Sequence, residues 1–218
     1  KGFVEEFRTY EPDLLLIAAY GKILPKDVLS VPKFGSLNIH PSLLPRWRGI
    51  SPIQASIRAG DATTGVTIIQ IDEEVDHGPI VVQETIKIDP EETAVELNRR
   101  LAEVGAKLLI KIIPQYLNGE NKSEKQDDAK ATYTKILNRE DGKINWDEPT
   151  EVIERKIRAL KPWPGTYTFY KEYGKEQLLK IHQASVVDGK LKLEIVQPAG
   201  GRPMSYQDFL RGHPEFTL

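Results

Sequence analysis

The residues in this chain best suited to chemistry are an amide and an imidazole two positions apart. Asn38 and His40 stand at the end of a short apolar segment, 35–39, that predicts a buried strand. Residues two apart on a strand point the same way, so both polar side chains would project into one spot. An amide that donates to a developing oxyanion, beside an imidazole that donates to it or moves a proton, suits the polarisation of a carbonyl. The plainer alternative is that both satisfy backbone carbonyls at a strand end.

A carboxylate that can serve the same site lies in the acidic stretch 72–79, between two predicted strands. Asp76 there can orient His40 or take up a proton. The alternative is an acidic surface turn, which is the common outcome for such a cluster. We assign the remaining titratable residues of the stretch to that surface: Asp72, Glu73, Glu74 and His77. No spacing typical of metal ligands occurs, so no metal site is expected.

The loop after His40 is stiffened by Pro41, Pro45 and Gly49. Its adjacent leucines, within Ser42-Leu43-Leu44-Pro45, cannot both face one core, so one of them can line a pocket. Ordinary loop packing is the alternative. The following residues, Arg46, Trp47 and Arg48, either bind an anionic or nucleic-acid partner by charge and stacking or form a solvated basic loop.

Strand and helix signals alternate over residues 1–118, which predicts an α/β domain. Strands are expected at 14–19, 35–39, 65–71 and 80–88, and helices at the start of the chain, at 26–30, at 51–60 and from 89 to 119. The continuous apolar run 14–19 predicts a strand buried on both faces of a parallel sheet. Pro114 is expected to kink or shorten the last helix. Ligands lie off the carboxyl ends of such strands, so the Ile23-Leu24 loop and the 40–49 loop should border one crevice.

The second half of the chain has a different pattern. Residues 119–130 are polar and charged, which predicts a linker. Beyond it, a helix is expected at 150–160, followed by strands at 166–173, 178–187 and 190–196 with turn signals between them. We therefore expect a small β-rich domain, a barrel, over 131–218.

Composition sets broad limits. The 218 residues carry a net charge of −2 and contain no cysteine. The whole-chain charge does not indicate nucleic-acid binding, so any RNA-binding surface would be local. No apolar run is long enough to span a membrane, and no signal peptide is visible at the start. The absence of cysteine excludes disulfides and fits a reducing cytoplasm.

Taken together, the segments resemble the 10-formyltetrahydrofolate-dependent formyltransferases. The resemblance rests on Asn38-Ile39-His40, on the loop from Ser42 to Gly49 and on Asp76-His77-Gly78-Pro79. Three more segments resemble the methionyl-tRNA formyltransferases within that family: Ala131-Thr132-Tyr133, Pro162-Trp163-Pro164-Gly165 and Phe209-Leu210-Arg211-Gly212-His213. The similarity runs from about Glu11 to about His213.

The resemblance implies a reaction and its residues. A formyl group would pass from 10-formyltetrahydrofolate to the α-amine of methionine on initiator tRNA, with no metal. The family's catalytic trio falls on Asn38, His40 and Asp76, where Asn38 and a protonated His40 stabilise the oxyanion and Asp76 accepts the amine's proton. Its folate site falls on Ser42, Leu43, Leu44 and Pro45, with Ile23 and Leu24 beside the pterin.

The family fold is implied as well. The chain would hold the C-terminal half of a Rossmann-like formyltransferase domain, residues 1–118, and an OB-like barrel, residues 131–218, that helps hold tRNA. Family members carry further strands before the one expected here at 14–19. We therefore expect an N-terminally truncated chain, self-association through the exposed sheet edge, and weak or no activity of this chain alone.

Two other functions remain open. A sugar-nucleotide N-formyltransferase would share the same trio, so the trio does not separate the two reactions; the segments at 162–165 and 209–213 favour the tRNA enzyme. A catalytically inactive fragment that binds folate or RNA would fit the truncated start.

Overall fold

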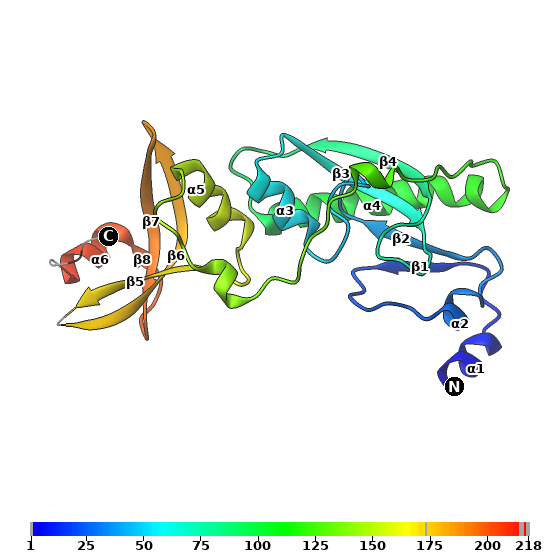
Figure 1. Cartoon of the computed structure of the whole chain (residues 1–218), viewed down its shortest axis with the longest axis horizontal. Helices are drawn as coiled ribbons and strands as arrows, with labels where there is room; N and C mark the ends of the chain where they lie inside the picture. The colour runs from blue at the N-terminus through cyan, green and yellow to red at the C-terminus, as the bar shows by residue number, and fades with distance from the viewer. Residues whose placement is uncertain (1, 173, 214–215, 217–218) are drawn as a thin grey trace. The chain divides into compact units, whose positions relative to one another are not determined.

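The computed structural model describes residues 2–172, 174–213 and 216. The chain divides into two compact units (Figure 1). Unit 1 comprises Lys1–Ser56, Ala62–Asp89 and Leu97–Ile136, and unit 2 comprises Ile57–Asp61, Pro90–Glu96 and Leu137–Leu218. The main boundary therefore lies at 136/137. The predicted domain limits at Lys1 and Leu218, and Tyr173 at the end of a predicted strand, lie outside the described residues.

Unit 1 is built on a mixed four-stranded sheet in the order β1-β2-β3-β4. Its strands are β1 (Leu15–Ala18), β2 (Ser36–His40), β3 (Thr63–Gln70) and β4 (Ile80–Lys87). Only β1 and β2 are parallel, and the β2–β3 and β3–β4 pairs are antiparallel. The α/β class is confirmed, but the expectation that 14–19 is buried on both faces is wrong. Strand β1 lies at the end of the sheet, and the Leu16 side chain is 44% exposed.

Four helices accompany this sheet: α1 (Gly2–Thr9), α2 (Lys26–Leu29), α3 (Pro52–Ala59) and α4 (Ala94–Leu117). Helix α4 runs along the sheet (Figure 1), and its Leu108 and Ile112 pack with Leu37, Ile68 and Val81 in one buried cluster. Pro114 does not end α4, which continues to Leu117. None of the described helices combines the length and apolar character that crossing a membrane requires.

The polar stretch 119–130, predicted to be a linker, packs on unit 1. Glu124 and Ile80 exchange backbone hydrogen bonds of 2.7 and 2.8 Å, so the stretch adds to the end of β4. Gln126 is 5% exposed, and a 3-10 helix, η1 (Asp128–Lys130), follows. Composition suggested a solvated linker because most side chains here are charged, but the backbone pairing and Gln126 hold the segment in place.

Unit 2 contains an antiparallel sheet in the order β5-β6-β7-β8. After the 3-10 helix η2 (Arg139–Gly142) come α5 (Thr150–Ala159), β5 (Thr166–Glu172), β6 (Lys175–Val187), β7 (Lys190–Pro198), β8 (Met204–Ser205) and α6 (Tyr206–Gly212). The predicted β-rich second domain is confirmed. The pairs in the described part of the chain run from β5 to β8 without joining the two, and the OB-like barrel stays a prediction.

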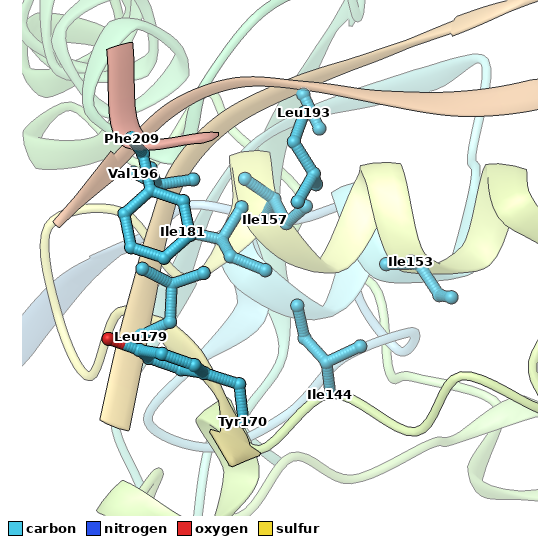
Figure 2. Packing of buried hydrophobic residues seen from close by; sticks show 10 residues of the cluster. Ile144, Ile153, Ile157, Tyr170, Leu179, Ile181, Leu193, Val196 and Phe209 are labelled. Carbon is cyan, nitrogen blue, oxygen red and sulfur yellow. The ribbon is translucent and has the colours of Figure 1, made fainter. Parts of the chain in front are cut away.

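A hydrophobic cluster forms the core of the described part of unit 2 (Figure 2). Ile153 and Ile157 come from α5, Leu179 from β6, Val196 from β7 and Phe209 from α6. The fully buried Phe209 ring also meets the Tyr170 ring edge-on at a centroid distance of 5.6 Å. The cluster draws on two helices and the sheet between them, so α6 is part of the core.

We expect Phe209→Ala to lower the free energy of unfolding of unit 2 by about 3–5 kcal/mol, the usual cost of emptying a buried phenylalanine site. The measurement is urea denaturation followed by tryptophan fluorescence in a Trp47→Phe background. Trp146 and Trp163 then report on unit 2 alone.

The control is Leu210→Ala at the neighbouring position, where the side chain is 36% exposed. Its cost should stay below about 1 kcal/mol. Equal losses for the two variants would contradict the placement of α6 on the core.

Candidate active site

Strand β2 places Asn38 and His40 on one side of unit 1, two residues apart as predicted. His40 ends β2, is paired with Thr67 of β3 and is only 4% exposed. Asn38 lies two positions earlier, opposite Ile69. Since β2 has neighbours on both sides, its backbone groups are used by the sheet, and the two side chains are free to serve the site.

Asp76 lies against both of them. The Asn38 Nδ2 atom donates to Asp76 Oδ1 over 3.3 Å, and His40 Nδ1 is 3.4 Å from the same oxygen. The Gly49 backbone N–H donates to Asp76 Oδ2 over 2.8 Å. The structure therefore brings together the three predicted catalytic residues, which come from β2 and from the turn between β3 and β4.

The hydrogen bonding of His40 decides its proton position. His40 Nε2 lies 2.9 Å from the Trp47 carbonyl oxygen, which can only accept, so Nε2 carries a hydrogen. Burial lowers the pKa of His40 below its ordinary value, and the Asp76 carboxylate opposes this by raising it. The balance favours a neutral ring at pH 7 with Nδ1 unprotonated toward Asp76. The expectation of a protonated His40 is therefore not supported.

Two non-glycine residues at the site have left-handed backbone conformations. Trp47 has φ 63° and Asp76 has φ 49°. Such conformations are rare outside glycine and gather at functional sites. The Trp47 conformation presents its carbonyl to His40, and the Gly49 conformation, φ 105°, presents its N–H to Asp76. A side chain at Gly49 would approach the Thr134 hydroxyl to 2.8 Å.

The loop from Ser42 to Pro45 is held by two polar side chains of the sheet, the buried Thr67 and the exposed Gln83. Thr67 Oγ1 donates to the Ser42 carbonyl over 2.6 Å and accepts from the Leu44 N–H over 3.1 Å. Gln83 Nε2 donates to the Leu44 carbonyl over 2.8 Å. These hydrogen bonds fix the backbone of the predicted folate segment to the sheet.

Side chains in the same loop divide between core and site. Leu44 is 3% exposed, whereas Leu43 and Pro45 are half-buried, so Leu43 is the leucine that can line a pocket. Ser42 is fully buried and its hydroxyl donates to the Arg46 carbonyl over 2.7 Å. The Ser42 side chain thus serves the loop itself, and the Ser42 backbone is used as well, since its N–H donates to the His40 carbonyl and its carbonyl accepts from Thr67.

The predicted second folate loop, Ile23-Leu24, lies after β1. Ile23 is 77% exposed and Leu24 is half-buried. On either side of this loop, a side-chain carbon added to Gly21 would lie 3.5 Å from Ile50, and the Lys26 ammonium lies 2.6 Å from the Glu73 carboxylate. Neither contact involves Ile23 or Leu24, so their place at the site stays a prediction.

Arg48 fits neither a binding loop nor a solvated loop, whereas Arg46 is exposed. Arg48 is 1% exposed and binds neither solvent nor a partner, since its guanidinium donates to Gln126, Asp128 and Tyr133. The Arg46 guanidinium lies 4.1 Å from the centre of the neighbouring Trp47 ring.

Gln126 was missed by the sequence argument. It lies in the stretch predicted as a linker, yet its Nε2 donates to the carbonyls of Asp76 and Gly78, each over 2.8 Å. A side chain at Gly78 would overlap the Gln70 carbonyl oxygen, so this turn must hold glycine. The same segment holds a second amide, Asn121, so nothing in the sequence singled out Gln126.

His77, the residue after Asp76, pairs with two acidic residues, Asp72 and Asp128. His77 Nδ1 lies 2.6 Å from Asp72, and its Nε2 lies 3.5 Å from Asp128. The hydrogen bond with Asp72 is the main cause that raises the pKa of His77 above its ordinary value. Across the described residues, no group of three or more histidines, cysteines and acids is arranged to hold a metal ion.

Comparison with known proteins agrees with this fold. A family model described as formyl transferase matches residues 1–113, and a second, described as formyl transferase, C-terminal domain, matches residues 136–190. Fold and matched segments define a formyltransferase of two units.

Similar proteins of known name identify one family within the formyltransferases. The methionyl-tRNA formyltransferase of Chloroflexus aggregans is 41% identical over 99% of this chain and 77% of its own length. That of Marinobacter nauticus is 46% identical over 98% of this chain and 75% of its own. The chain belongs to the methionyl-tRNA formyltransferase family. The first alignment extends over 242 residues, more than the 218 of this chain, so that relative has internal residues without a counterpart here.

Solved structures share the fold. The methionyl-tRNA formyltransferase from Clostridium thermocellum aligns with a TM-score of 0.67 at 24% identity, over 89% of this chain and 81% of its own. HypX from Aquifex aeolicus, in complex with tetrahydrofolic acid, aligns with a TM-score of 0.72 at 20% identity, over 95% of this chain and 40% of its own. A likely sugar N-formyltransferase from Mycobacterium tuberculosis aligns with a TM-score of 0.67 at 21% identity, over 80% of this chain and 75% of its own.

The two histidines near Asp76 should titrate on opposite sides of the ordinary histidine pKa, about 6.5. Burial places His40 below it, and the Asp72 hydrogen bond places His77 above it. The measurement is an NMR titration of ring ¹⁵N shifts, which also identifies the Nε2–H tautomer of neutral His40.

The lowered pKa of His40 also makes the free energy of unfolding depend on pH. The unfolded chain takes up the His40 proton near pH 6.5, before the folded chain does, so the contribution of neutral His40 to the free energy of unfolding is present above that pH and is lost as pH falls. His77→Gln is the control for assignment. A His40 that titrates above His77 would contradict the buried, neutral ring.

Proposed function

We propose that this chain transfers a formyl group from 10-formyltetrahydrofolate to the α-amine of methionyl-initiator tRNA. The observation that carries the proposal is the arrangement of Asn38, His40 and Asp76 around one carboxylate oxygen, in a chain that belongs to the methionyl-tRNA formyltransferase family. Folate as the donor is supported by the structural neighbour HypX, whose structure contains tetrahydrofolic acid.

The reaction requires a neutral amine to attack the formyl carbon and form a tetrahedral oxyanion. The Asn38 amide has two hydrogens and donates one to Asp76, so the other can be donated to the oxyanion. The attacking nitrogen must lose a proton. Asp76 is the proposed acceptor, directly or through water, and neutral His40 can share that proton through Nδ1. Collapse of the oxyanion then breaks the bond between the formyl carbon and N10 of the folate, and the proton held by the Asp76–His40 pair passes to N10, so that tetrahydrofolate leaves.

For the folate we propose a site formed by the Ser42–Pro45 loop and the Ile23-Leu24 loop. The partly exposed Leu43 and the exposed Ile23 offer apolar surface to a pterin ring. We propose that unit 2 acts as an OB-like module that helps hold the tRNA.

The substrate is tested by supplying the same chain with 10-formyltetrahydrofolate and either methionyl-initiator tRNA or an amino-sugar nucleotide. We expect formylated methionyl-tRNA and no formylated sugar. The likeness to a sugar N-formyltransferase is at 21% identity and concerns the fold alone, whereas the relatives named above are twice as similar. Formylation of the sugar only would overturn the proposed substrate.

Asn38→Ala and Asp76→Ala should each lower kcat for formyl transfer on the order of 10²–10³-fold, the usual effect of removing an oxyanion donor or its equivalent. Both residues act on the reacting atoms in this proposal, so thermal stability should change little. The measurement is steady-state formylation together with thermal unfolding of each variant.

The matched control is Glu73→Gln, which removes an acid from the same turn where the side chain is 65% exposed. Its kcat should stay near that of the unmodified chain. Near-normal turnover of the Asn38 or Asp76 variant would refute the catalytic assignment.

We also propose that the free edge of β1 pairs with a second copy of the chain. Among the described strands, β1 has a neighbour only on its β2 side, and Leu16 exposes apolar surface there. Unpaired strand edges with apolar side chains favour strand addition.

Sedimentation velocity over a range of concentrations should therefore detect a dimer that weakens in a Leu16→Lys variant, because an edge lysine opposes pairing. Phe3→Lys, an exposed apolar residue on α1, is the control. A monomer at every concentration would exclude this mode of association.

A further inference from the structure

The backbone of the turn that carries Asp76 is bonded at two points by one side chain from outside the turn, that of Gln126. Asp76 itself lies in a left-handed conformation with no helix or strand around it. The Gln126 Nε2 atom donates to the Asp76 and Gly78 carbonyls, on both sides of His77. Gln126 is 5% exposed, so water does not substitute for these bonds, and the turn depends on this amide.

The orientation of the Gln126 amide is set by Arg48. The Arg48 Nε and one terminal nitrogen donate to Gln126 Oε1 over 3.1 and 2.9 Å. A guanidinium only donates and a backbone carbonyl only accepts, so just one orientation of the amide satisfies both neighbours. Arg48 is in turn held by Asp128, 2.8 Å away, and by the Tyr133 hydroxyl, 3.2 Å away.

Arg48 also fixes the second support of Asp76. It directly precedes Gly49, whose N–H donates to the Asp76 carboxylate. The Arg48 backbone is pinned on both sides, since its N–H donates to the Thr132 carbonyl over 2.8 Å and its carbonyl accepts from Thr134 over 2.7 Å. The Arg48–Gln126 pair thus connects the backbone of Asp76 to the donor of its carboxylate.

We propose that Arg48 and Gln126 are positioning residues that aim the Asp76 carboxylate at Asn38 and His40. This inference rests on the proposed formyl transfer for its effect on rate, but not for its effect on the geometry of Asp76. A displacement of about 1 Å at a reacting group can cost on the order of 10²-fold in rate. Neither residue touches the reacting atoms, and both act through Asp76.

The first test is Gln126→Glu. A glutamate keeps the acceptor for Arg48 but replaces the donor with an oxygen that the Asp76 and Gly78 carbonyls repel. We expect kcat for formyl transfer to fall on the order of 10²-fold, while KM for the folate stays nearly unchanged. Glu124→Gln, two positions away in the same segment, is the control: its side chain is exposed and the backbone that pairs with Ile80 is unchanged, so it should leave kcat unchanged.

A double-mutant cycle separates positioning from general damage. In an Asp76→Asn background, Gln126→Glu should lower kcat no further, because there is no carboxylate left to aim. An additional loss as large as that in the unmodified chain would overturn the proposal.

A titration tests the positioning role of Gln126 without measuring turnover. Its result therefore does not depend on whether the chain transfers formyl groups. The Asp76 carboxylate raises the pKa of His40. Gln126→Met, neutral and similar in length, should therefore lower the His40 pKa measured by NMR, in the same direction as Asp76→Asn. An unchanged His40 pKa in the folded Gln126→Met variant would overturn the proposal even if the chain formylates methionyl-tRNA.

Discussion

The candidate active site depends on which groups donate hydrogen bonds to one carboxylate, that of Asp76. Asp76 is 15% exposed, and an ionised carboxylate can only accept hydrogen bonds, so donors must be brought to it from elsewhere in the chain. The Gly49 N–H and the Asn38 amide provide them. Each donor imposes a condition on its own segment: Gly49 needs a conformation that suits glycine, and Asn38 needs to stand near the end of β2.

His40 shows how burial and charge compete at such a site. Burial disfavours the imidazolium, whereas the nearby Asp76 carboxylate favours it, and the Trp47 carbonyl fixes the hydrogen on Nε2. A neutral ring with Nδ1 toward Asp76 is prepared to take up a proton rather than to stabilise an oxyanion by charge. In the proposed reaction, oxyanion stabilisation would then fall to Asn38, and proton transfer to the Asp76–His40 pair.

Backbone polar groups in the loops around the site are also paired by side chains from elsewhere in unit 1. Thr67 and Gln83 satisfy the backbone of the Ser42–Pro45 loop, and Gln126 satisfies the Asp76 turn. These side chains come from β3, β4 and the segment after α4, so the sheet of unit 1 serves as a rigid support for irregular loops. Unit 2 has its own core, which fits a division in which unit 1 carries the chemistry.

The sequence by itself determined the local features. The spacing of Asn38 and His40, the apolar strands, the change of pattern beyond residue 118 and the segments typical of methionyl-tRNA formyltransferases were all visible, because strand period, turn residues and motifs are properties of neighbours in the chain. The tertiary structure alone decided which distant groups meet. Arg48 suggested a binding loop and Gln126 a linker, since charge and polarity predict exposure. Both are buried because each satisfies the other, and a pairing across nearly eighty residues leaves no periodic signal in the sequence.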